Sequence, residues 1–133
     1  MSIFKETSIF GNMYINSEVR LERLEKSLYS VSKLNFKYQI FSFRGIFNKE
    51  AKLLTKKYFA NSNLFLGEDN EVWLKKSYNL INKFNSRFWI IFLEDHILLD
   101  SNNLKDVIND MNLNDLEYCE YSWNFNGNLI KEF

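Results

Sequence analysis

The order of strand-like and helix-like segments constrains the fold of this chain more than any other feature of its sequence. Short apolar segments, rich in aromatic residues, alternate with segments whose apolar residues recur every three or four positions. The strand-like segments are 8–15, 36–43, 63–66, 88–93 and 117–125, and the helix-like segments are 18–34, 49–59, 73–84 and 104–111. This alternation predicts an α/β fold, a three-layer sandwich with helices on both faces of a mainly parallel central sheet.

The first helix-like segment is the most clearly marked of these elements. Its apolar residues recur at steps of three and four, namely Leu21, Leu24, Leu28, Val31 and Leu34. Asn16 or Ser17 stands directly before it, and either side chain can cap a helix. With the strand-like segments before and after it, the helix forms a strand-helix-strand unit that closes at Arg44 and Gly45.

The length of the chain favours a single domain over residues 1–133. A chain of 133 residues buries about two thirds of the surface that it exposes when unfolded. No internal repeat, low-complexity segment or linker interrupts the sequence. Trp73 and Trp89 each fall on an apolar face, so both are expected in the core.

Charge and composition exclude several functions and compartments. Lysine and arginine together number 17, and so do aspartate and glutamate, so no net field draws the chain to nucleic acid or to an anionic membrane. No segment is long and apolar enough to predict a membrane span. The N-terminus does not resemble a signal peptide, and the single cysteine, Cys119, suits a reducing compartment. We therefore expect a cytoplasmic protein.

The most apolar run of the chain, 88–93, ends directly on Glu94, Asp95 and His96. An uninterrupted apolar run predicts a central parallel strand that is buried on both faces. Ligands of open α/β sheets bind at the carboxyl ends of strands, which is where these three residues are expected. While the chain stays extended, Glu94 and His96 face one side and Asp95 the other. Oxygen and nitrogen ligands of this kind suit Mg²⁺ or Mn²⁺, and the alternative is a solvated polar turn.

A resemblance gives this strand end a more specific interpretation. The apolar strand followed by Leu93, Glu94, Asp95 and His96 resembles the Leu-Asp-x-Asp or Leu-Glu-Asp-Asp segment of family 2 glycosyltransferases, which have the GT-A fold. Asn79 occupies a place similar to that of an upstream helical Asn in the family. The opening strand and helix, 14–34, are also similar. The resemblance implies a GT-A or Rossmann-like sheet that binds a nucleotide sugar together with Mn²⁺ or Mg²⁺.

Carried over by position, the resemblance implies roles for Glu94, Asp95 and His96. Glu94 is expected near the ribose, and Asp95 or His96 on the metal, with His96 standing where the family has an acid. The family also has an acid at the end of its second strand, where this chain has Arg44. That arginine can pair with a phosphate or lie on the surface. The nucleotide-sugar site is therefore predicted at Glu94, Asp95, Asn79 and Arg44, and the metal site at Asp95 and His96.

Two functions follow from these patterns. The first is a glycosyltransferase-like protein that binds a nucleoside diphosphate sugar with a divalent metal and transfers the glycosyl group. No residue of this chain is matched to the catalytic base of the family. The alternative is a truncated, non-catalytic α/β domain that acts as a binding or partner-interaction module. The family's acceptor-binding half has no counterpart in 1–133, so a homo-oligomer or a partner chain that supplies this half is expected. A metal-dependent nuclease is disfavoured by the neutral charge.

Overall fold

The computed structural model describes residues 3–68, 72–116, 123–125 and 128–130. Contacts divide the chain into two compact units, Met1–Leu99 and Asp100–Phe133. The prediction of a single domain over 1–133 stays a prediction. Cys119 and most of the predicted strand 117–125 lie outside the described residues.

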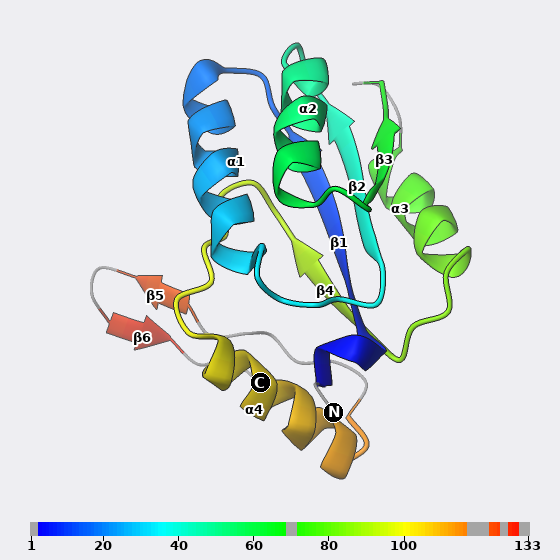
Figure 1. Ribbon diagram of the computed structural model, residues 1–133, viewed down its shortest axis with the longest axis vertical. Coiled ribbons are helices and arrows are strands. Elements are labelled where there is room, and N and C mark those ends of the chain that lie inside the picture. Colours follow the sequence, from blue (N-terminus) through cyan, green and yellow to red (C-terminus); the bar gives the residue numbers. More distant parts are fainter. Residues whose placement is uncertain (1–2, 69–71, 117–122, 126–127, 131–133) are drawn as a thin grey trace. The chain divides into compact units, whose positions relative to one another are not determined.

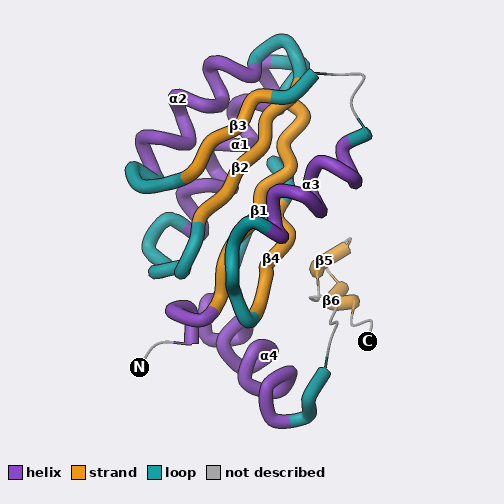
Figure 2. The backbone as a smooth tube through the Cα atoms, turned by 90° about the vertical axis from the view of Figure 1, so that its right-hand side faces the viewer, coloured by secondary structure: helices purple, strands orange, loops and turns teal. Residues whose placement is uncertain are grey.

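The first unit alternates strands and helices as the sequence predicts. Its elements are η1 (Ile3–Glu6, a 3-10 helix), β1 (Thr7–Tyr14), α1 (Glu18–Val31), β2 (Gln39–Arg44), α2 (Asn48–Tyr58), β3 (Asn63–Leu66), α3 (Trp73–Asn82) and β4 (Phe88–Phe92). The strands form one parallel sheet in the order β3-β2-β1-β4 (Figure 1). Helices α1 and α2 cover one face and α3 the other (Figure 2). The predicted three-layer α/β sandwich is confirmed.

Helix α1 begins where the sequence places it. The Ser17 side chain caps it and accepts a hydrogen bond from the backbone N–H of Arg20 at 3.2 Å, which satisfies one of the free donors of the first turn. The helix ends at Val31 rather than at the predicted residue 34. A buried stripe faces the sheet and contains Leu24, Ser27, Leu28 and Val31.

Strand β1, and not the apolar strand β4, lies inside the sheet. Thr7, Ser8 and Asn12 of β1 are buried although they are polar. β4 is the last strand in the order of this sheet, and Ile91 is 55% exposed. The prediction that 88–93 is a central strand buried on both faces is therefore wrong. An apolar run reports hydrophobicity, whereas burial also depends on which neighbours lie beside and above the strand.

The two tryptophans expected in the core behave differently. On the α3 side of the sheet, Phe10, Ile40 and Leu80 form a buried cluster against which Trp89 packs. Trp73 opens α3 and is 47% exposed, so its assignment to the core is wrong. The first turn of α3 leaves this side chain partly in solvent even though it follows the helical period of the buried residues.

The second unit contains the predicted helix and a pair of short strands. Helix α4 (Ser101–Leu113) is capped by Asp100 and buries Leu104 and Ile108. β5 (Trp123–Phe125) pairs antiparallel with β6 (Asn128–Ile130). Among the described residues, no helix has the length and apolar character needed to cross a membrane.

Candidate functional site

The strand order creates a topological switch point at the carboxyl ends of β1 and β4. From β1 the chain passes through α1 to β2 on one side, and from β3 it passes through α3 to β4 on the other side of β1 (Figure 1). The connecting helices lie on opposite faces of the sheet. At such a point the loops diverge and leave a crevice in which open α/β sheets bind their ligands.

Four side chains gather at this edge, and we call them the switch-point cluster: Tyr14, Arg20, Arg44 and Glu94. Tyr14 and Arg44 are register partners at the ends of β1 and β2. The guanidinium carbons of Arg20 and Arg44 lie 5.6 Å and 5.3 Å from the centroid of the Tyr14 ring. Arg20 Nη1 lies 3.6 Å from Glu94 Oε1. Two cations and one carboxylate leave the cluster with a net positive charge.

Arg44 is held at this edge by an unusual turn. The next residue, Gly45, has φ of +98°, and a Cβ atom there would lie 2.3 Å from the backbone oxygen of Ile15. Glycine is therefore required for the close approach of the two chain segments. The Nε atom of Arg44 is buried and has no hydrogen-bond partner among the described residues. A buried guanidinium N–H without a partner is costly, so this group needs a partner such as a water molecule or an anion.

Glu94 is positioned by helix α1. The hydroxyl of Ser27 donates a hydrogen bond to the backbone oxygen of Glu94 at 2.7 Å. Four residues further on, the backbone N–H of Leu98 donates to the hydroxyl of Ser30 at 3.0 Å. The Glu94 side chain is only 14% exposed. Two serines on α1 therefore fix the segment 94–98 against the helix.

The chain turns immediately after β4, which corrects the expected facing of the acidic residues. The backbone N–H of His96 donates to the oxygen of Leu93 at 3.1 Å, closing a turn over 93–96. The prediction that Glu94 and His96 share one side required an extended chain, and this turn removes that condition. The Nδ1 atom of His96 instead accepts a hydrogen bond from the backbone N–H of Leu93 at 3.3 Å.

The remaining predicted residues take no part in the contacts of the switch-point cluster. Asn79 is exposed on α3, where it lines a hollow beside Phe65 of β3, at the other end of the strand order from β4. Asp95 is exposed in the turn after β4. Within the described ranges, no three His, Cys, Asp or Glu side chains form a group that can hold a metal ion. The metal site at Asp95 and His96 stays a prediction.

Sequence patterns alone do not single out Tyr14, Arg20 and Ser27 as site residues, although two of them carry a signal. Arg20 lies in the first turn of α1, where a cation adds to the positive end of the helix dipole instead of compensating it. Ser27 interrupts the buried stripe of α1, and a polar residue in such a stripe needs a partner. Tyr14 has no comparable signal, because an aromatic residue at a strand end is ordinary.

Comparison with known proteins adds no assignment. No protein-family model matches the chain, and no curated protein matches it either.

Proposed function

We propose that this protein binds a nucleoside diphosphate sugar at the switch-point cluster, with Arg20 and Arg44 facing the diphosphate. The observation that carries the proposal is the buried Nε atom of Arg44, which has no hydrogen-bond partner among the described residues, on the same Tyr14 ring that Arg20 also approaches. Guanidinium groups are suited to phosphate oxygens because their planar forks make two parallel hydrogen bonds.

The N-terminus of α1 adds to the preference for an anion at this edge. Its backbone N–H groups and dipole present positive charge directly after β1. Glu94 neutralises part of this charge through Arg20. In the resemblance to family 2 glycosyltransferases, the residue at the position of Glu94 contacts the ribose. A ligand with a diphosphate and a ribose satisfies both the arginines and the carboxylate.

The proposal is tested by titrating the full chain with uridine and guanosine diphosphate sugars, each with Mn²⁺ and with EDTA, and following thermal stability and calorimetric heat. Binding is expected in both conditions because the arginines supply positive charge. The Arg44→Gln substitution removes a charge-assisted contact of about 1.5–3 kcal/mol, so Kd should rise at least about tenfold. Arg23→Gln is the matched control, because Arg23 is exposed on α1 outside the cluster.

Three results bear on the proposal differently. Absence of any shift across the panel, with and without metal, overturns it. If binding occurs only with Mn²⁺ or Mg²⁺, a metal ion neutralises the diphosphate in place of the arginines, as predicted for Asp95 and His96. Release of nucleoside diphosphate from the bound donor, when acceptor sugars are added, distinguishes a glycosyltransferase from a module that only binds.

A second candidate function is a partner-interaction module. It is favoured by exposed apolar side chains on α3 and β4, where Leu74 and Tyr78 are 66% and 67% exposed and Ile91 is 55% exposed. Solvent-exposed apolar groups of this kind stabilise association when they are covered. Light scattering over a concentration series should then show a homo-oligomer, and a monomer at all concentrations contradicts self-association.

A further inference from the structure

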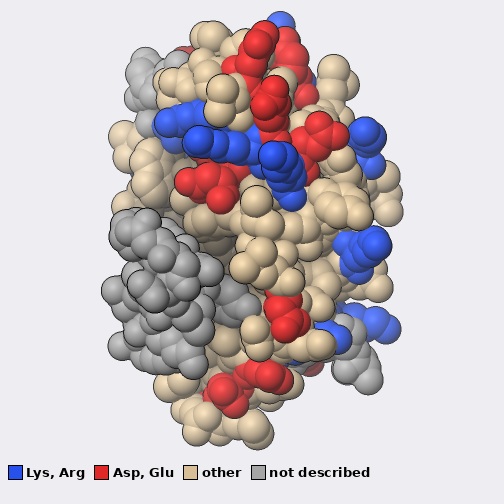
Figure 3. Space-filling view, turned by 90° about the vertical axis from the view of Figure 1, so that its left-hand side faces the viewer, with Lys and Arg blue, Asp and Glu red and all other residues tan. Residues whose placement is uncertain are grey.

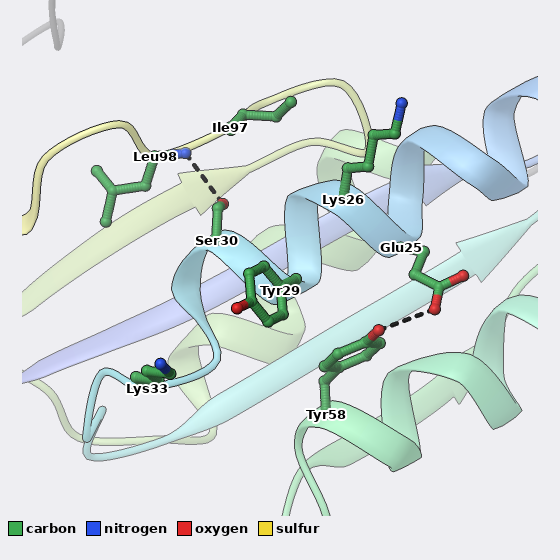
Figure 4. A pocket seen from close by; sticks show the side chains of 8 residues that line it. All are labelled: Glu25, Lys26, Tyr29, Ser30, Lys33, Tyr58, Ile97 and Leu98. Atoms are coloured by element: carbon green, nitrogen blue, oxygen red, sulfur yellow. Dashed lines mark hydrogen bonds between the residues drawn. The ribbon is translucent and has the colours of Figure 1, made fainter.

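A second hollow lies along α1, away from the switch-point cluster, and shares no residue with it. It has a volume of about 730 Å³ and lies between α1, the last residue of α2 and the segment 97–98. Figure 4 shows Tyr29 of α1 and Tyr58 of α2 approaching each other across it. The volume falls within the range of about 300–1,000 Å³ that is typical of small-molecule sites.

The two tyrosines form an ordered aromatic pair. Their ring centroids lie 6.5 Å apart at an interplanar angle of 79°, an edge-to-face arrangement that is favourable for aromatic rings. The Tyr58 hydroxyl donates a hydrogen bond to Glu25 Oε1 at 2.8 Å (Figure 4). This hydrogen bond raises the pKa of Tyr58, so the hydroxyl stays protonated. Tyr29, in contrast, is 62% exposed and presents its ring to solvent.

Hydrogen-bonding groups at the edge of this pair are only partly used. Oε1 of Glu25 accepts the hydrogen bond from Tyr58 and lies 3.8 Å from Lys57 Nζ, whereas Oε2 has no hydrogen-bond partner among the described residues. The same holds for the hydroxyl of Tyr29. Ile97 and Leu98 supply apolar surface nearby. The hollow thus offers an aromatic face, an acceptor and a donor side by side.

Charges of both signs surround the hollow. Lys26 and Lys33 line it together with Glu25, whose Oε1 atom also lies 3.8 Å from Lys57 Nζ. On the side of the molecule that carries α1, basic and acidic side chains lie interspersed in the upper part of the view in Figure 3. A neutral ligand rich in hydroxyl groups can hydrogen-bond to groups of both signs without depending on either charge.

We infer that this hollow is a binding site for a neutral saccharide. The carbons of a pyranose ring bear oxygens, so the C–H bonds on the ring face carry partial positive charge and are attracted to the negative face of an aromatic ring. The sugar ring stacks on Tyr29, and its hydroxyls donate to Glu25 Oε2 and accept from the Tyr29 hydroxyl. Hydrogen bonds to a carboxylate are stronger than those between neutral groups. The hollow shares no residue with the switch-point cluster, so each proposal has its own test.

The test is a nuclear magnetic resonance titration of the full chain with neutral disaccharides of glucose, galactose, mannose and N-acetylglucosamine. Amide shifts are expected at Tyr29, Ser30 and Leu98. Tyr29→Ala should raise the Kd of the bound sugar about two- to tenfold, and Glu25→Gln, which keeps the shape of the side chain, should raise it by less. Tyr78→Ala is the matched control, since Tyr78 is similarly exposed but lies on α3.

Several outcomes overturn the inference. One is the absence of amide shifts at the hollow with every sugar of the panel. Another is a loss of binding in the Tyr78→Ala protein as large as that in the Tyr29→Ala protein. Shifts at the same amides with tetramethylammonium or inorganic phosphate, and none with sugars, show an ionic site instead. If Tyr29→Ala does not fold, the isosteric Glu25→Gln protein decides, because unchanged sugar affinity in that variant contradicts the role of the carboxylate.

Discussion

The turn that holds Arg44 gives the sharpest prediction, which concerns Gly45→Ala. A side chain at φ of +98° is strained by about 1–3 kcal/mol. The new Cβ would lie 2.3 Å from the Ile15 oxygen, about 1 Å short of an ordinary C···O contact. That oxygen accepts a hydrogen bond from the backbone N–H of Phe47 at 3.0 Å, and its loss costs about 1 kcal/mol. We expect a loss of about 3 kcal/mol in the free energy of unfolding.

The assay is urea unfolding monitored by circular dichroism, together with thermal unfolding, in which the expected loss lowers Tm by about 10 °C. Ile46→Ala is the matched control, because Ile46 follows Gly45 directly and is 76% exposed. Its effect should stay within about 0.5 kcal/mol. If Gly45→Ala is as stable as Ile46→Ala, the turn does not have this conformation, and the position of Arg44 that depends on it is refuted as well.

Three further predictions concern α1 and its neighbours. Leu28→Ala opens a cavity at a side chain with 0% exposure and should cost about 2–5 kcal/mol in urea unfolding; a cost below about 1 kcal/mol contradicts the assigned core. Ser27→Ala removes the hydrogen bond to Glu94 and should cost about 1 kcal/mol, with faster hydrogen exchange over 94–98; unchanged exchange argues against the anchoring. The pKa of Tyr58 is raised, first by its hydrogen bond to Glu25. The stabilisation that this hydrogen bond gives the folded protein is complete below the pKa of an unfolded tyrosine, about 10, and is lost as the pH rises through the pKa of Tyr58 in the folded protein. In the Tyr58→Phe protein, the free energy of unfolding should fall less steeply above a pH of about 10, because no hydroxyl ionises at this position. Identical pH profiles of stability in the two proteins refute this prediction.

The elements were predictable from the sequence because each depends on local periodicity. The strand 63–66 was predicted with the bounds that β3 has, and the helix after Ser17 starts where its cap requires. The order of the strands was not predictable in this way. The run 88–93 is the most apolar of the chain, yet β4 lies at the end of the strand order, while the more polar β1 lies inside. Position in a sheet is decided by crossovers between distant segments, which the composition of a strand does not encode.

The candidate site was predictable in its place but not in its composition. Glu94 and Arg44 were placed at strand ends, and the parallel sheet brings those ends to one edge. The partners that join them come from elsewhere in the chain: Tyr14 through the register with Arg44, and Arg20 by reaching over the edge to Glu94. Contacts of this kind depend on three-dimensional register and side-chain direction, so a spacing in the sequence does not reveal them.

Helix α1 links the two proposed sites and allows them to be separated by experiment. Through Ser27 it holds the backbone of Glu94 in the switch-point cluster, and through Ser30 it holds Leu98 at the saccharide hollow. Ser27→Ala releases only the first of these anchors. We therefore expect it to weaken binding of a nucleoside diphosphate sugar while the Leu98 amide keeps its response to saccharides. Equal loss at both sites means that the segment 94–98 moves as one piece, because the anchor at Ser30 alone does not hold Leu98 in place.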